Sequence, residues 1–136
     1  VLRALGVKRG LVVASLDGLD EISVSAGTRI AELKDGEIRM YEIVPDDLGL
    51  GTYSLRDVVG GDAQTNADII RSVFRGERGA RRDIVLANAG ACFYVSGHCS
   101  TLQEGVKKAA SVIDSGKAME KLEQLIRFTG ELSHVS

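Results

Sequence analysis

Asp35 and Gly36 constrain the fold more than any other pair of residues in this chain. They separate two strand-like runs, residues 28–34 and 37–44. A type I′ turn needs a positive φ at both central residues, and Asp-Gly adopts this conformation at low cost. Pro45 lacks a backbone N–H and ends the second run. The sequence therefore predicts an antiparallel β-hairpin over residues 28–44, followed by a loop over residues 46–52.

A third strand-like run, residues 11–16, precedes the hairpin. It reads Leu-Val-Val-Ala-Ser-Leu, with little alternation of polar and apolar residues. This pattern is typical of a strand covered on both faces, as in parallel sheets. An edge of this strand left unpaired would invite pairing with another chain, so we predict that this chain either self-associates or occurs together with the remainder of a longer protein. Before it, residues 1–6 resemble the last turn of a helix, with Gly6 just past its end.

Helical patterns occupy the second half of the chain. Asp62 is a suitable N-cap for an amphipathic helix, and residues 84–95 favour a buried helix because of their length and their alanines. Gly116 separates two further amphipathic helices. The apolar positions of the three amphipathic helices are Ile69, Ile70, Val73 and Phe74, then Leu102, Val106, Ala110 and Ile113, then Met119, Leu122, Leu125 and Ile126. The predicted fold class is α/β: part of a mostly parallel sheet with a β-hairpin and several packed helices.

Length, charge and cysteine content narrow the function classes. The 136 residues suit one domain, and a net charge of −2 argues against nucleic acid as the main partner. No apolar run is long enough to span a membrane, and no signal-peptide pattern is present. Cys92 and Cys99 match no metal or redox motif and suit a reducing compartment. We therefore predict a cytoplasmic protein that binds neither nucleic acid nor membranes.

Three carboxylates follow the first strand: Asp17, Asp20 and Glu21, with Gly18 among them. Mg²⁺ prefers oxygen ligands and commonly takes one or two carboxylates, completing its shell with water and phosphate. The adjacent pair Asp20 and Glu21 suits that role, and Asp17 suits a role in orienting the ligating carboxylates or the loop. In the alternative interpretation, Asp17 caps a turn and the other two acids face solvent.

Two polar features are open to more than one interpretation. Arg75, Arg78, Arg81 and Arg82 could meet phosphate, but the interleaved acids favour a solvated loop over residues 75–83. Asn88, inside an apolar segment, needs hydrogen-bond partners. It either braces the loop near the site or is a satisfied core side chain.

The acidic loop and four later motifs together resemble the anthranilate phosphoribosyltransferase family. Leu16 to Ser23, read as LDGLDEIS, is similar to the family's Asp-Gly-x-Asp-Glu motif. The remaining motifs follow in the family's order: the hairpin with Pro45 to Gly49, Gly60-Gly61-Asp62 with Asn66-Ala67, residues 83–95 with Asn88-Ala89, and Asp114 to Ala118. The resemblance covers the whole chain but only the C-terminal part of the family's length.

The resemblance implies a nucleoside phosphorylase/phosphoribosyltransferase-like catalytic domain and a function. Asp20 and Glu21 would bind Mg²⁺, which holds the pyrophosphate of phosphoribosyl pyrophosphate, while anthranilate is the acceptor and tryptophan biosynthesis the pathway. The resemblance assigns no catalytic side chain within this chain.

On the same basis, residues 1–136 are expected to be the C-terminal part of one α/β domain, without the N-terminal helical domain and the first half of the α/β domain. Such a chain would be inactive alone. The full-length protein would form a homodimer, and self-association is the expectation for the fragment. A pyrimidine nucleoside phosphorylase-like enzyme and a non-catalytic nucleic-acid-binding relative are the alternatives.

Overall fold

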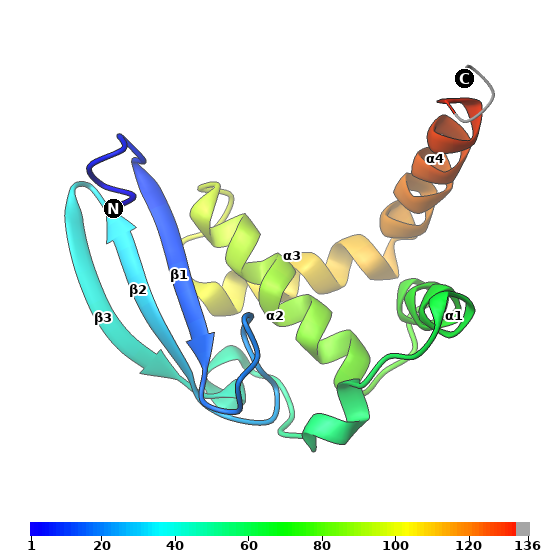
Figure 1. Ribbon diagram of the computed structural model, residues 1–136, viewed down its shortest axis with the longest axis horizontal. Coiled ribbons are helices and arrows are strands. Elements are labelled where there is room, and N and C mark those ends of the chain that lie inside the picture. Colours follow the sequence, from blue (N-terminus) through cyan, green and yellow to red (C-terminus); the bar gives the residue numbers. More distant parts are fainter. Residues whose placement is uncertain (133–136) are drawn as a thin grey trace.

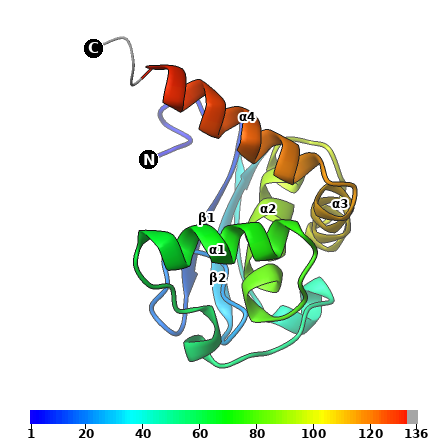
Figure 2. The ribbon, with the colours of Figure 1, turned by 90° about the vertical axis from the view of Figure 1, so that its right-hand side faces the viewer.

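The computed structural model describes residues 1–132, which form a small sheet with helices stacked to one side of it (Figure 1). The sheet contains β1 (Arg9–Ser15), β2 (Thr28–Lys34) and β3 (Glu37–Ile43). The helices are α1 (Ala63–Phe74), α2 (Ala80–Val95), α3 (Leu102–Asp114) and α4 (Lys117–Leu132). Helix α2 lies beside the sheet, α3 packs on α2, and α4 projects away from the body (Figures 1 and 2).

The β-hairpin is confirmed. Strands β2 and β3 pair antiparallel, with Lys34 opposite Glu37. Asp35 and Gly36 take φ values of 52° and 81°, as a type I′ turn requires. Pro45 ends β3 and begins a short 3₁₀ helix, Pro45–Leu48, in the segment for which a loop was predicted. A second 3₁₀ helix, Leu55–Val58, was also not predicted.

The prediction of a mostly parallel sheet is wrong for the part of the chain that the structure describes. The three strands have the order β1-β2-β3, and β1 pairs antiparallel with β2, with Val12 opposite Ala31. Only one face of β1 is covered, since Val12 is 55% exposed. A short apolar run does not encode the direction of its partner. The loop over residues 16–27 sets that direction here, because it turns the chain back beside β1.

The predicted helices are confirmed, with one correction. The Asp62 side chain accepts a hydrogen bond from the backbone N–H of Thr65, so it caps α1 as expected. Gly116, with φ of 81°, separates α3 from α4. Helix α2 begins at Ala80, four residues before the predicted start, so Arg81 and Arg82 are helical and do not belong to a loop. Residues 1–6 form a hydrogen-bonded turn that ends at Gly6, where φ is 85°.

The core lies between β2, α2 and α3. Its members include Ile22, Ile30, Leu86, Val106 and Ile113, each at most 5% exposed. Two glycines allow the backbones of α2 and α3 to touch. A Cβ placed on Gly105 would lie 2.2 Å from the carbonyl oxygen of Gly90. No larger residue fits there without separating the two helices.

A buried carboxylate ties α2 to the sheet. Glu32 on β2 is 7% exposed and accepts hydrogen bonds from the hydroxyls of Tyr41 and Tyr94. The guanidinium carbon of Arg9 lies 4.4 Å from the centre of the Tyr94 ring, which places a cation beside this network. Burial, followed by the charge and hydrogen bond of Glu32, raises the pKa of Tyr41. Both tyrosines therefore act as hydrogen-bond donors that satisfy the buried acid.

An apolar trough of about 510 Å³ lies between β1 and α2. Its walls include Leu11, Val13, Ile22, Asn88, Ala91 and Val95. Among residues 1–132, β1 pairs only with β2, so the other edge of β1 has no partner strand. The trough lies beside this unpaired edge. The same described region contains no helix with the length and apolar character needed to cross a membrane.

Candidate functional site

The candidate site is the acidic loop, residues 16–27, which connects β1 to β2. Backbone bonds close its base: the Leu16 N–H donates to the Gly27 carbonyl at 2.8 Å, and the Ser15 N–H to the Leu19 carbonyl at 3.1 Å. Gly18 takes a φ of 91°, a conformation that L side chains rarely adopt. The loop is therefore a tight, hydrogen-bonded excursion that carries all three candidate acids.

Asp17 lies at the centre of a group of serine hydroxyls. Its carboxylate accepts hydrogen bonds from Ser15, Ser23 and Ser25, and the Ser23 bond is 2.7 Å long. Burial raises the pKa of Asp17, but the hydrogen bonds from the three serines outweigh it and lower the pKa to about 2. The carboxylate is thus charged at neutral pH and holds together residues from both ends of the loop.

Asp20 and Glu21 have no such partners. Within residues 1–132, neither carboxylate has a hydrogen-bond or ion-pair partner. Asp20 is exposed and Glu21 half-buried. Burial, and then the neighbouring charge of Asp20, raise the pKa of Glu21. Two adjacent acids that repel each other and have no basic partner among residues 1–132 fit the chemistry of a divalent metal ligand pair.

The acid pair is not a complete protein cage for a metal ion. No group of three or more His, Cys, Asp or Glu side chains that could hold a metal occurs in the described part of the chain. A cation at this pair would have to take its remaining ligands from water and phosphate oxygens, which is the usual arrangement for Mg²⁺. This donor set fits Mg²⁺ bound together with a phosphorylated ligand.

Asn88 on α2 reaches the acidic loop. Its Oδ1 accepts a hydrogen bond from the Ile22 N–H at 2.9 Å, and its Nδ2 donates to the Ile22 carbonyl at 3.0 Å. Nδ2 also donates to the Ile84 carbonyl at 2.9 Å. Of the two interpretations left open by the sequence, both apply: the side chain is satisfied and it braces the loop.

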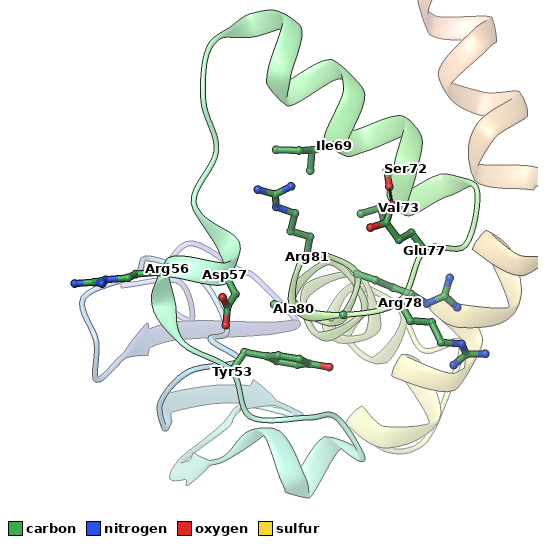
Figure 3. Close-up of a pocket in the computed structure, with 12 residues that line it drawn as sticks. Tyr53, Arg56, Asp57, Ile69, Ser72, Val73, Glu77, Arg78, Ala80 and Arg81 are labelled. Atoms are coloured by element: carbon green, nitrogen blue, oxygen red, sulfur yellow. Dashed lines mark hydrogen bonds between the residues drawn. The ribbon is translucent and has the colours of Figure 1, made fainter.

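The arginine cluster does not form a convergent anion site. A cavity of about 410 Å³ between α1 and the start of α2 is lined by Arg56, Arg78, Arg81 and Arg82, but also by Asp57 and Glu77. Figure 3 shows Arg81 pointing towards Ile69, whereas Arg56 points away from the cavity. Arg82 is 3% exposed and donates to Asp114 at 2.7 Å, so the predicted solvated loop is wrong for this residue. Its role is to join α2 to the end of α3.

The serines around Asp17 were not identified from the sequence. A signal for them is present, because Ser15, Ser23 and Ser25 flank the acids at both ends of the loop. Serine is common in turns, however, and the sequence does not show that three hydroxyls converge on one carboxylate.

Comparison with known proteins assigns this chain to a protein family. Residues 1–119 match the model of the glycosyl transferase family, a/b domain. The chain belongs to this family.

The curated relatives give a more particular assignment: the chain is a homologue of anthranilate phosphoribosyltransferases. It is 50% identical over 136 residues to the enzyme of Brevibacillus brevis and 47% identical over 133 residues to that of Petrotoga mobilis. These alignments cover 100% and 98% of this chain, but 40% and 39% of the relatives. The chain thus spans about two fifths of the length of the curated relatives it matches.

Solved structures agree with this assignment. The crystal structure of anthranilate phosphoribosyltransferase from Thermus thermophilus matches with a TM-score of 0.84 and 37% identity, over 93% of this chain and 37% of that one. The Saccharomyces cerevisiae enzyme in complex with PRPP and Mg matches with a TM-score of 0.75 and 25% identity, over 85% of this chain and 33% of that one.

Proposed function

We propose that this chain is part of an anthranilate phosphoribosyltransferase that transfers the phosphoribosyl group from phosphoribosyl pyrophosphate to anthranilate and releases pyrophosphate. The observation that carries the proposal is the unpartnered pair Asp20 and Glu21 on a braced loop. The relatives support it, because they bear the name of this enzyme and one was solved with PRPP and Mg. The product would serve tryptophan biosynthesis in the cytoplasm.

In this proposal, Asp20 and Glu21 would hold Mg²⁺. When bound there, the metal would supply positive charge to offset the negative charge that develops on the leaving pyrophosphate. The chain's own residues position the two carboxylates: Asp17 and its serines fix one side of the loop, and Asn88 fixes the other. Positioning and electrostatics would then provide most of the rate enhancement, with no covalent nucleophile from this chain.

The rest of the site, including the anthranilate contacts, would lie in the portion of the relatives that this chain does not span. We therefore expect no phosphoribosyl transfer by residues 1–136 alone. Turnover by the purified chain without any partner would contradict this expectation. A homodimer of the complete enzyme, and self-association of this chain through the edge of β1, are further parts of the proposal.

The first test is binding of phosphoribosyl pyrophosphate to this chain, measured by calorimetry with and without Mg²⁺. Asp20→Asn and Glu21→Gln should each weaken the Mg²⁺-dependent part of binding about tenfold or more, because each replaces an anionic metal ligand with a neutral amide. Glu123→Gln, which neutralises an exposed acid on α4, is the matched control and should bind as the unaltered chain does. Equal binding by all four proteins would refute the metal assignment.

The second test concerns activity. It uses a chimera in which this chain takes the place of the matching segment of the Thermus thermophilus enzyme, to which it is 37% identical. The chimera should consume anthranilate in the presence of phosphoribosyl pyrophosphate and Mg²⁺, and Glu21→Gln in the chimera should abolish most of this activity. A chimera that folds and retains full activity after both acids are neutralised would contradict the proposal.

A further inference from the structure

We infer that Asn88 is a positioning residue for the metal-binding acids, and that it works by clamping the peptide groups of Ile22. The inference rests on the proposed function of Asp20 and Glu21. The Ile22 N–H belongs to the peptide that begins at Glu21, and the Ile22 carbonyl belongs to the next peptide. Asn88 bonds both, at 2.9 and 3.0 Å. The chain direction immediately after the acid pair is thereby fixed from α2.

The clamp is rigid because every part of it is anchored. Ile22 is 1% exposed and belongs to the core, so its backbone has no solvent to replace a lost bond. The second N–H of the Asn88 amide donates to the carbonyl of Ile84, one turn earlier in α2. This bond sets the side-chain orientation and uses the remaining donor of the amide. A 16-residue helix therefore carries the clamp as a fixed point.

The acid pair lies between two anchors. On one side, Asp17 gathers the hydroxyls of Ser15, Ser23 and Ser25, and on the other, Asn88 holds Ile22. Two adjacent carboxylates repel each other, so an unrestrained loop would relax to separate them. Holding the loop before the cation arrives removes the ordering cost from the binding step. Asn88 thus contributes to metal affinity without touching the metal.

The competing interpretation is that Asn88 only satisfies the core. The chain provides a matched control, because Asn66 makes the same two-bond clamp on another loop. The Gly61 N–H donates to Asn66 Oδ1 at 2.8 Å, and Asn66 Nδ2 donates to the Gly61 carbonyl at 2.9 Å. Removing the Asn66 amide costs two backbone hydrogen bonds. Removing the Asn88 amide costs the two bonds to Ile22 and the bond to the Ile84 carbonyl. Only the Asn88 clamp is bonded to the acidic loop.

The experiment uses the ¹⁵N-labelled chain of 136 residues, with Mn²⁺ and pyrophosphate as the probe. Mn²⁺ broadens the amide signals near its site, and hydrogen exchange reports on the Ile22 N–H directly. In Asn88→Ala, we expect exchange at Ile22 to accelerate at least about tenfold and the Mn²⁺ concentration for half-broadening of residues 19–22 to rise about tenfold. Asn66→Ala should lower thermal stability and leave the Mn²⁺ midpoint unchanged.

Asn88→Asp provides a second variant if the alanine variant does not fold. It keeps an acceptor for the Ile22 N–H but has no N–H to donate to Ile22 or Ile84, so it should also weaken Mn²⁺ binding. If the unaltered chain binds Mn²⁺ and the Asn88 variants have the same Mn²⁺ midpoint, the positioning role of Asn88 is overturned while the metal site stands. An equal loss in Asn66→Ala would overturn it as well. Absence of Mn²⁺ broadening in the unaltered chain would overturn both the metal site and the inference.

Discussion

Replacing Gly105 with alanine tests the closest helix contact of the fold. The added Cβ would lie 2.2 Å from the backbone oxygen of Gly90, whereas real Cβ contacts stay above 3.0 Å. The two helices must therefore separate by about 0.8 Å (3.0 minus 2.2), because neither atom belongs to a flexible side chain. Overpacking of this kind costs about 3 kcal/mol at the upper end of the usual range, and alanine regains about 1 kcal/mol in helix propensity. The expected net loss of unfolding free energy is about 2 kcal/mol.

Urea denaturation followed by circular dichroism measures this loss, and the melting temperature should fall by roughly 4–10 °C. Gly130→Ala is the matched control, because a Cβ built on Gly130 in α4 meets no atom of another element within 4 Å among residues 1–132. That variant should gain up to about 1 kcal/mol from helix propensity alone. A Gly105→Ala chain as stable as the unaltered protein would refute the argument, since it would mean that α2 and α3 do not touch along their backbones.

Three other features of the structure can be tested by substitution. The pKa of Asp17 is lowered to about 2 from the ordinary 3.8, so its ionised form stabilises the fold above pH 3.8. This contribution to the free energy of unfolding is lost as the pH falls towards 2. In Asp17→Asn, stability measured against pH should not show this loss. Asp114→Ala leaves the buried Arg82 guanidinium without its ion pair, so the free energy of unfolding, measured by thermal denaturation, should fall by about 1–3 kcal/mol. Adding Arg82→Met to this variant should recover part of the loss, because it removes the unpaired charge. Light scattering should show that the chain self-associates as its concentration rises, and Val12→Lys on the edge strand β1 should reduce this association. A monodisperse monomer at all concentrations would exclude pairing through β1.

Local signals predicted much of the fold. Asp35-Gly36 determined a turn, Asp62 a helix start and Gly116 a helix break, because each depends on φ values or caps that a few neighbouring residues determine. The direction of β1 was not predictable in this way. Its apolar run is compatible with a parallel or an antiparallel partner, and only the path of residues 16–27 decides between them.

The same distinction between local and long-range signals applies to the candidate site. The acids were identified from their spacing and from a family resemblance, because oxygen-rich loops have a recognisable composition. The supporting contacts are long-range: Asn88 and Ile22 are 66 residues apart, and no periodicity in the sequence relates them. Arg82 was misassigned for a similar reason, since its partner Asp114 lies 32 residues further along the chain.

The wall shared by the apolar trough and the acidic loop has a thermodynamic consequence. Ile22 and Asn88 line the trough, and the same two residues hold the loop that carries the acid pair. A segment that packs in the trough and stiffens this wall would raise the affinity of the loop for a cation. By reciprocity, the cation would raise the affinity of the trough for its occupant by the same factor. A rise in the metal affinity of the loop would then indicate that the trough beside β1 is occupied.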